Sequence, residues 1–219
     1  MSLNYQKARD LMVENQLRPN KISNPDILDL FRHIKKEDFL PDDIKELSYL
    51  DIDIDLEQNR GYLKNLHIAQ LISNSKINKK DKILHIGGLT GYVSVMLSKL
   101  CKKLIVLESN EKLFNNLLRK KETQNLQNIE IINKSLENGF KERAPYDIIF
   151  IDNPINTISD TIKEQINSNL GKIIVVKRQS KHLSKAFRIT KSNNNFTNEY
   201  LFDVFSKYEL HKKEKGFIF

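Results

Sequence analysis

The segment ILHIGGLTGY, residues 83–92, is the strongest indication of the fold of this chain. A mostly apolar run, Ile83 to Ile86, is followed by glycines at 87, 88 and 91. This pattern predicts a buried strand, a tight turn and the start of a helix. In a doubly wound α/β sheet, such a turn lets backbone N–H groups approach a nucleotide cofactor. The alternative is that Gly87, Gly88 and Gly91 only turn the chain tightly.

A second feature supports the cofactor interpretation. The apolar run KLIVLES, residues 103–109, contains Glu108 near its end, 21 residues after Gly87. An acidic residue at this position is placed to accept hydrogen bonds from ribose hydroxyls. NAD and S-adenosyl-L-methionine (AdoMet) both carry an adenosine ribose, so these two features do not choose between them. An NAD-dependent dehydrogenase is the least favoured of the candidate functions, because nothing in the sequence indicates a hydride-transfer site.

The chain from residue 65 onward alternates between strand and helix patterns. Strands are predicted at 82–88, 103–109, 129–135, 146–153 and 171–178, and helices at 65–75, 91–100, 110–124 and 158–170. This alternation predicts an α/β fold with a doubly wound, mostly parallel sheet covered on both faces. Antiparallel strands at 185–190, 198–205 and 215–219 are expected to complete it. We therefore expect a helical extension, residues 1–64, packed on a domain of residues 65–219 as one compact unit.

The extension contains a run of alternating aspartates. Helices are predicted at 5–17 and 26–34, and another begins after Pro41. Asp51, Asp53 and Asp55 have the spacing of the first ligands of a calcium loop, but Leu56 stands where that loop requires glycine. The alternation with Ile52 and Ile54 instead predicts a half-buried extended segment at residues 51–56.

The composition limits the classes of protein. The length of 219 residues fits one α/β domain with an extension, and no apolar run reaches membrane-spanning length. We expect a cytoplasmic protein with no membrane partner. Cys101 is the only cysteine and the histidines form no HxxxH pair, so no metal site is expected. The net charge of +8 is spread along the chain without interleaved aromatics, which favours solvated charge over a nucleic-acid surface. The oligomeric state stays open.

The predicted strand at 146–153 ends beside the same crevice. Asp152, Asn153 and Pro154 are similar to a motif of enzymes that methylate amino groups of nucleic acids, but Ile155 and Asn156 replace its second proline and its aromatic residue. No Ser–His–Asp or Cys–His arrangement is evident, and no catalytic residue is predicted. A carboxylate acceptor would need no general base, because it is ionised at neutral pH with a pKa of about 4.

Several segments resemble the protein-L-isoaspartate O-methyltransferase family over most of the chain. The segment at 83–100, ILHIGGLTGYVSVMLSKL, is similar to the family's VLEIGTGSGYQAAVLA, and APYDIIFID at 144–152 is similar to APYDAI.V. The opening NQLRPNK and the closing GF.F pattern are similar to a shorter alphaproteobacterial-type branch. The residues of the extension that fall in step with the family are Met12, Val13, Gln16, Leu17, Ile27, Leu28, Phe39, Leu40, Pro41 and Tyr49.

The resemblance implies a Rossmann-like class I AdoMet-dependent methyltransferase that acts on a carboxylate of a damaged protein or peptide. It places Ser135 and Leu136 beside the adenine and Asp152 near the methionine end of the cofactor. The predicted cofactor-binding residues are His85, Gly87, Gly88, Gly91, Tyr92, Glu108, Ser109, Ser135, Leu136 and Asp152.

The departures from the family pattern leave alternatives open. The family's GQTISQP substrate loop is replaced by QNRGYLKNL at 58–66, where Leu63 takes the serine position; the substrate-loop candidates are Arg60, Gly61, Tyr62 and Leu63. His85 and Ser135 stand at acidic positions of the family, and Leu89 at a glycine position. His85 is either a hydrogen-bonding residue of the site or a satisfied core histidine. The alternatives to an active enzyme are a noncatalytic descendant that binds AdoMet or a protein partner and, third, a nucleic-acid methyltransferase.

Overall fold

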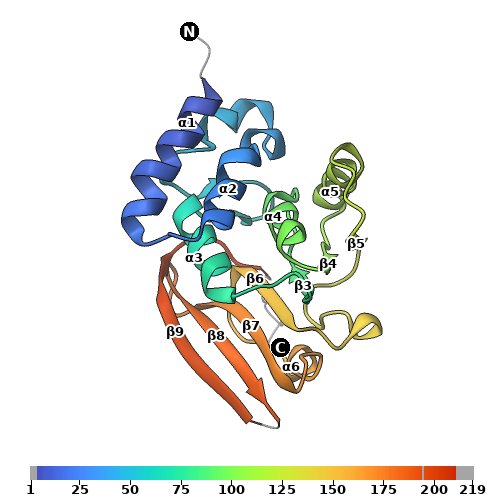
Figure 1. Cartoon of the computed structure of the whole chain (residues 1–219). Helices are drawn as coiled ribbons and strands as arrows, with labels where there is room; N and C mark the ends of the chain where they lie inside the picture. The colour runs from blue at the N-terminus through green and yellow to red at the C-terminus, as the bar shows by residue number, and fades with distance from the viewer. Residues whose placement is uncertain (1–3, 194, 211–219) are drawn as a thin grey trace, which may run out of the picture.

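The computed structural model describes residues 4–193 and 195–210 and is built around a seven-stranded sheet (Figure 1). The strand order is β5-β4-β3-β6-β7-β8-β9. The first five strands in this order are parallel, whereas β8 and β9 are antiparallel. The predicted fold class is confirmed. The strands are β3 (Lys82–Ile86), β4 (Lys103–Leu107), β5 (Ile129–Ile132), β6 (Ile148–Ile155), β7 (Asn169–Arg178), β8 (Leu183–Ser192) and β9 (Asn195–Phe205).

Both faces of the sheet are buried over its central strands β3, β4, β6 and β7. Alternate strand residues point to opposite faces, so Val106 and Phe150 join one apolar cluster while Ile105 and Ile149 join the other. The first cluster includes apolar residues of α3 (Asn65–Ser75), α4 (Tyr92–Leu100) and α5 (Glu111–Thr123). The second includes Ile162 of the short helix α6 (Asp160–Glu164). This two-sided burial explains why the strands read as nearly continuous apolar runs.

The N-terminal extension packs on the first of these faces (Figure 1). Helix α1 (Tyr5–Met12) continues as a π-helical turn, Val13–Leu17, and a 3₁₀ turn, Arg18–Asn20. Helix α2 (Pro25–His33) starts with a proline in its first turn and is capped by the Asn24 side chain. Two further 3₁₀ turns follow at Lys36–Phe39 and Asp42–Leu47. The apolar residues of the extension belong to the same buried cluster as the sheet, and a boundary after residue 64 stays a prediction.

The alternating segment forms only a short strand. β1 (Ile54–Asp55) pairs with β2 (Gly61–Tyr62) in a separate antiparallel ribbon. Ile54 is buried, as predicted, but Ile52 is 43% exposed. The side chain of Asp53 accepts a hydrogen bond from the Lys64 backbone N–H at 2.9 Å. Because Asp53 bonds to the protein in this way, the segment at 51–56 is not divided into one apolar and one solvent-facing polar side.

Tertiary contacts shorten the helix that was predicted at 158–170. Helix α6 ends at Glu164, and β7 has already begun at Asn169. The chain between them pairs with the segment before β6, where the Asn167 N–H donates to the Tyr146 carbonyl at 2.8 Å. The predicted strand at 215–219 lies outside the described residues. Within the parts of the chain that the structure describes, no helix is long and apolar enough to cross a membrane.

Candidate functional site

The carboxyl ends of three central strands form the candidate site. β3 lies between β4 and β6, and the chain runs from β3 through β4 to β5 on one side before β6 and β7 continue on the other. Gly87 and Glu108 directly follow the last residues of β3 and β4, and Asp152 lies within β6 at the level where the neighbouring β3 ends. This reversal of strand order is where ligands bind in such sheets. The topology therefore brings the three predicted residues to one edge of the sheet, where a cofactor crevice is expected.

The turn after β3 uses backbone conformations that favour glycine. Gly87 and Gly91 have φ values of +90° and +103°, and Leu89 has a φ of +52°. The N–H groups of Gly87 and Gly88 both donate to the Leu107 carbonyl, at 2.9 and 3.1 Å. The Tyr92 N–H, at the start of α4, donates to the Tyr62 hydroxyl at 3.0 Å. These amides are thus bonded within the protein.

Glu108 is held by four donors. Its side chain is fully buried and forms a bidentate ion pair with Arg60, with Nη1–Oε1 at 2.7 Å and Nη2–Oε2 at 2.8 Å. The backbone N–H groups of Leu89 and Asn110 donate to the same carboxylate, each at 2.9 Å. Bidentate arginine–carboxylate pairs are among the stronger side-chain interactions. The acid predicted to bind ribose is bonded to the protein itself.

Arg60 reaches this carboxylate from the turn between β1 and β2. Gln58 and Asn59 both have left-handed backbone conformations, with φ of +51° and +63°. After this tight turn, the Leu56 N–H donates to the Arg60 carbonyl at 3.0 Å. Gly61 approaches the neighbouring chain closely, since a Cβ there would lie 2.2 Å from the Ile54 carbonyl oxygen. The hairpin therefore places Arg60 in the interior, with 6% of the residue exposed.

Residues 206–210 close the crevice from another direction. The Leu210 N–H donates to the carbonyl of Pro154, in β6, at 2.8 Å. A Cβ added to Gly87 would lie 2.6 Å from Leu210 Cδ1 and 3.1 Å from Arg60 Nη2. The glycine turn and the strand-end acid suit a nucleoside cofactor chemically. In this conformation, however, Leu210 and Arg60 fill the space beside Gly87.

His85 is a hydrogen-bonded core residue. Its side chain is 1% exposed, with Nδ1 lying 2.9 Å from Ser94 Oγ and Nε2 lying 3.3 Å from Asp152 Oδ1. Its ring also meets Phe150 edge to face. Both interpretations that the sequence left open for His85 are compatible with this arrangement, and its place among the cofactor-binding residues stays a prediction. Through His85, Asp152 is linked to β3 and to α4.

The other predicted cofactor residues occupy different environments. Ser109 and Ser135 are exposed, whereas Leu136 is buried in the apolar cluster that also contains Ile86 and Leu107. Leu136 thus lies in the apolar core, in the same cluster as the last residues of β3 and β4. The structure brings neither serine into a hydrogen bond with the Gly87–Glu108 turn among the described contacts.

The predicted substrate loop lies inside the protein. Tyr62 and Leu63 are each 1% exposed, and Gly61 and Arg60 are also buried. The Tyr62 hydroxyl lies 2.8 Å from Thr90 Oγ1, and burial raises the pKa of Tyr62 above its ordinary value. These contacts connect the loop to the glycine turn. Any role of Arg60, Gly61, Tyr62 and Leu63 in binding substrate stays a prediction.

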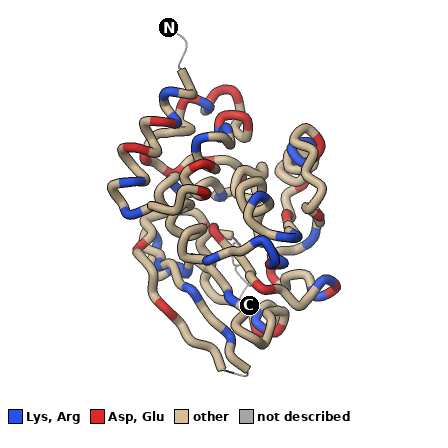
Figure 2. The backbone as a smooth tube through the Cα atoms, viewed as in Figure 1, with Lys and Arg blue, Asp and Glu red and all other residues tan. Residues whose placement is uncertain are grey.

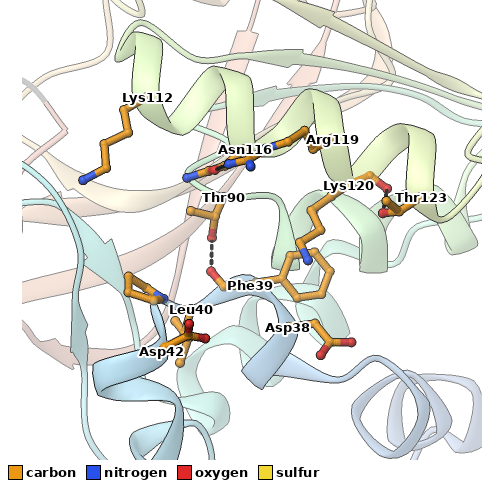
Figure 3. Close-up of a pocket in the computed structure, with 11 residues that line it drawn as sticks. Asp38, Phe39, Leu40, Asp42, Thr90, Lys112, Asn116, Arg119, Lys120 and Thr123 are labelled. Atoms are coloured by element: carbon orange, nitrogen blue, oxygen red, sulfur yellow. Dashed lines mark hydrogen bonds between the residues drawn. The ribbon is translucent and has the colours of Figure 1, made fainter.

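An open groove lies on the outer side of the glycine turn (Figure 3). It has a volume of about 600 Å³ and runs between residues 38–42 of the extension and helix α5. Thr90 of the glycine turn also lines the groove and donates a hydrogen bond to the Phe39 carbonyl at 2.6 Å. Lysine and arginine side chains of α5 face Asp38 and Asp42 across it. Figure 2 shows basic and acidic residues mixed over most of the molecule rather than gathered on one face. The cationic residues that line the groove are Lys112, Arg119 and Lys120.

The sequence did not reveal the contacts that close the crevice. Arg60 and Glu108 are 48 positions apart, and Leu210 lies far from both along the chain. Their pairing depends on the hairpin turn and on the return of the chain after β9. A single sequence carries no local pattern for such contacts. Alignment of relatives could reveal them only if these positions vary together.

Comparisons with known proteins give a consistent family. A family model described as protein-L-isoaspartate(D-aspartate) O-methyltransferase (PCMT) matches residues 6–205. Protein-L-isoaspartate O-methyltransferase 2 of Pelobacter propionicus is 22% identical over 188 residues, which are 86% of this chain and 83% of the relative. The protein-L-isoaspartate O-methyltransferase of Petrotoga mobilis is 23% identical over 200 residues, covering 90% and 93% of the two chains.

The fold is also found in a solved structure of a protein-L-isoaspartate O-methyltransferase. The two structures superpose with a TM-score of 0.77 at 22% sequence identity. The match covers 90% of this chain and 64% of the solved chain, so the present chain spans less than two thirds of that protein. The Rossmann-like methyltransferase fold predicted from the sequence is confirmed.

Proposed function

Because the chain belongs to the protein-L-isoaspartate(D-aspartate) O-methyltransferase family, we propose that it transfers a methyl group from AdoMet to a carboxylate of a damaged protein or peptide. The observation that carries this proposal is the extent of the family match. It spans residues 6–205 and so includes both the extension and the sheet whose edge carries Gly87, Glu108 and Asp152. A cytoplasmic location and a protein substrate belong to the same proposal.

The residues of the crevice suggest how the cofactor is held. Glu108 is the acceptor for ribose hydroxyls, and Gly87 allows the cofactor to approach the backbone. Leu136 offers an apolar surface for the adenine, and Asp152 lies toward the methionine end. Bound AdoMet supplies an electrophilic methyl group on its sulfonium. Arg60 and Leu210 must first leave the space beside Gly87 that they now fill.

A carboxylate acceptor requires no general base from the protein. A carboxylate is ionised at neutral pH, so no side chain has to remove a proton before it attacks. The task of the chain is to orient the carboxylate oxygen and to exclude water from the crevice. The open groove between residues 38–42 and α5 is a candidate path for the polypeptide, because it borders Thr90 of the glycine turn and has polar walls of both charges.

Methyl transfer to paired peptides tests this function. Labelled AdoMet is incubated with an isoaspartyl peptide and with the same peptide containing ordinary aspartate. Label is expected only in the isoaspartyl peptide, as a base-labile methyl ester. Glu108→Gln should lower AdoMet affinity about 10-fold or more, because a charged hydrogen-bond acceptor contributes roughly 1.5–3 kcal/mol. Exposed Glu111, three residues further on, supplies the matched control Glu111→Gln, which should bind AdoMet like the parent. No transfer despite measured AdoMet binding would remove the proposed activity.

The second candidate function is a noncatalytic member of the family. The observation that favours it is the saturated Glu108 carboxylate, whose four donors all come from the protein. A calorimetric titration of the folded protein with AdoMet, read together with the transfer assay, separates the two candidates. Binding with transfer supports the enzyme, whereas binding without transfer, or no binding at millimolar cofactor, supports the noncatalytic alternative.

A further inference from the structure

The buried Arg60–Glu108 pair lies where the cofactor's ribose is expected. Both carboxylate oxygens accept from Arg60 at 2.7 and 2.8 Å, and each accepts a second bond from a backbone N–H. Two carboxylate oxygens offer about four lone-pair sites in total. Ribose hydroxyls therefore cannot bond to Glu108 while all four donors remain. The donor that can leave is Arg60, because the other two groups belong to the backbone beside Glu108 and the glycine turn.

Residues 206–210 hold the hairpin that carries Arg60. The Glu209 N–H donates to the carbonyl of Asn59, the residue before Arg60, at 3.3 Å. A Cβ on Gly61, the residue after Arg60, would lie 2.7 Å from Tyr208 Cζ. Leu210 meets both the Pro154 carbonyl and the open side of Gly87. Release of Arg60 and displacement of this segment are therefore structurally linked.

The closed arrangement leaves polar atoms without partners. Arg60 Nε and Asn153 Oδ1 are buried, and neither finds a hydrogen-bond partner among the residues that the structure describes. A buried unsatisfied polar group costs roughly 1–3 kcal/mol. The Arg60–Glu108 pair is thus strong, but buried polar atoms of and beside the pair lack hydrogen-bond partners among the described residues. A ligand that bonds to Glu108 while Arg60 returns to water removes part of that cost.

We propose that Arg60 and residues 206–210 form a latch over the cofactor crevice, and that AdoMet binds only after Arg60 has left Glu108. The inference rests on the proposed function for the identity of the ligand. In the closed state, Arg60 competes with the ribose for one carboxylate, and Leu210 excludes the cofactor from Gly87. The apparent affinity for AdoMet is then the intrinsic affinity multiplied by the fraction of molecules with an open latch.

The first test measures AdoMet affinity by calorimetry. Arg60→Ala removes the competitor, so its dissociation constant should fall about 10-fold or more below that of the parent, as the open fraction rises. The matched control is Arg143→Ala, which removes an arginine that pairs with Glu130 at the surface. This control should bind like the parent. Equal affinities for Arg60→Ala and the parent would overturn the latch while leaving cofactor binding intact.

The second test needs no cofactor. Hydrogen exchange is measured on the parent and on Arg60→Ala, following the Leu210 amide that is bonded to the Pro154 carbonyl. Loss of the latch should raise exchange at residues 206–210 about 10-fold, while amides of the central strand β3 stay unchanged. Unchanged exchange at residues 206–210 would overturn the coupling of Arg60 to this segment. If exchange rises but neither protein binds AdoMet, the latch stands and the proposed function fails.

A second variant keeps the test decisive if Arg60→Ala does not fold. Leu210→Ala retains the Arg60–Glu108 pair and removes only the side chain that lies against Gly87. Its AdoMet affinity should rise several-fold, by less than in Arg60→Ala, because one of the two obstacles remains. Affinity equal to or weaker than that of the parent would contradict a role of residues 206–210 in closing the crevice.

Discussion

Two buried arginine–glutamate pairs in this protein are built differently. In the N-terminal extension, Arg9 Nη1 lies 2.5 Å from Glu37 Oε1, and the Tyr49 hydroxyl also donates to Glu37. The remaining nitrogens of Arg9 are bonded as well, with Nε donating to the Arg32 carbonyl at 3.1 Å and Nη2 to Gln6 Oε1 at 2.6 Å. Every nitrogen of this guanidinium group has a partner. The pair joins α1 to the segment after α2.

In the Arg60–Glu108 pair, the glutamate is fully hydrogen-bonded but the arginine is not. Glu108 is saturated by four donors, while Arg60 bonds only through its two terminal nitrogens and Nε has no partner among the described residues. A buried pair is strongly held only when its remaining polar groups are also satisfied. Two pairs that are equally buried can therefore have different roles. Arg9 stabilises the fold, whereas Arg60 occupies hydrogen-bonding positions on the Glu108 carboxylate that a ligand can take.

The largest expected effect is the loss of the fully bonded pair. Arg9→Gln should lower the free energy of unfolding by about 3–5 kcal/mol, because it leaves Glu37 charged and buried without its cation. Arg60→Gln should cost only about 1–3 kcal/mol, because Glu108 keeps two backbone donors and the unsatisfied Nε is removed. Urea denaturation of both variants measures the difference. Equal losses would show that the two pairs have the same structural role.

A third buried basic residue, Lys36, extends the comparison, because the pH dependence of its contribution to stability can be measured. The side chain of Lys36 is fully buried, with Nζ donating to Asn65 Oδ1 at 2.9 Å and lying 5.5 Å from the ring centroid of Tyr62. Burial lowers the pKa of Lys36 from 10.5 to about 7, against an opposing effect of the Asp53 carboxylate. Unlike either arginine, this group can lose its proton inside the folded protein.

The sign of the pH effect follows from this lowered pKa. Between about pH 10 and pH 7 the unfolded chain binds a proton at Lys36 that the folded protein does not, so the contribution of Lys36 to stability falls as the pH falls. Raising the pH from 7 to 9 should recover roughly 2 kcal/mol through this group. Lys36→Met should remove that gain, whereas exposed Lys35→Met should retain it. Identical pH profiles of unfolding for Lys36→Met and the parent would contradict a neutral buried lysine.

Much of the fold could be predicted from the sequence because it depends on local periodicity. The apolar run at 83–86 and the glycines after it predicted β3, the turn and α4, and all three are present. The same reasoning failed at 158–170, where pairing of Asn167 with Tyr146 outweighed helical propensity after Glu164. A local sequence pattern carries no information about a backbone partner some 20 residues away whose hydrogen bonds replace those of the helix.

The candidate site was less predictable, because its state depends on long-range contacts. The spacing of Gly87 and Glu108 correctly placed both residues at one edge of the sheet. It could not show that Arg60, from a segment expected to bind substrate, would occupy the Glu108 carboxylate. Similarly, the sequence placed the strand that carries Asp152 beside the same crevice, but it did not show that Asp152 pairs with His85.

The smallest predicted effect concerns Leu89, whose N–H is one of the two backbone donors that remain on Glu108 when Arg60 leaves. Leu89 is 1% exposed and has a φ of +52°, a conformation that costs a residue with a Cβ about 1–2 kcal/mol. Leu89→Ala and Leu89→Gly both lose the buried side chain, but only glycine relieves the backbone. We therefore expect Leu89→Gly to be more stable than Leu89→Ala by about 1 kcal/mol in urea denaturation. At Leu97, buried within helix α4, the order should reverse by about 1 kcal/mol because glycine is the poorer helix former. The same order at both sites would mean that the turn relaxes around Leu89, and that the backbone donor to Glu108 is no more fixed than Arg60.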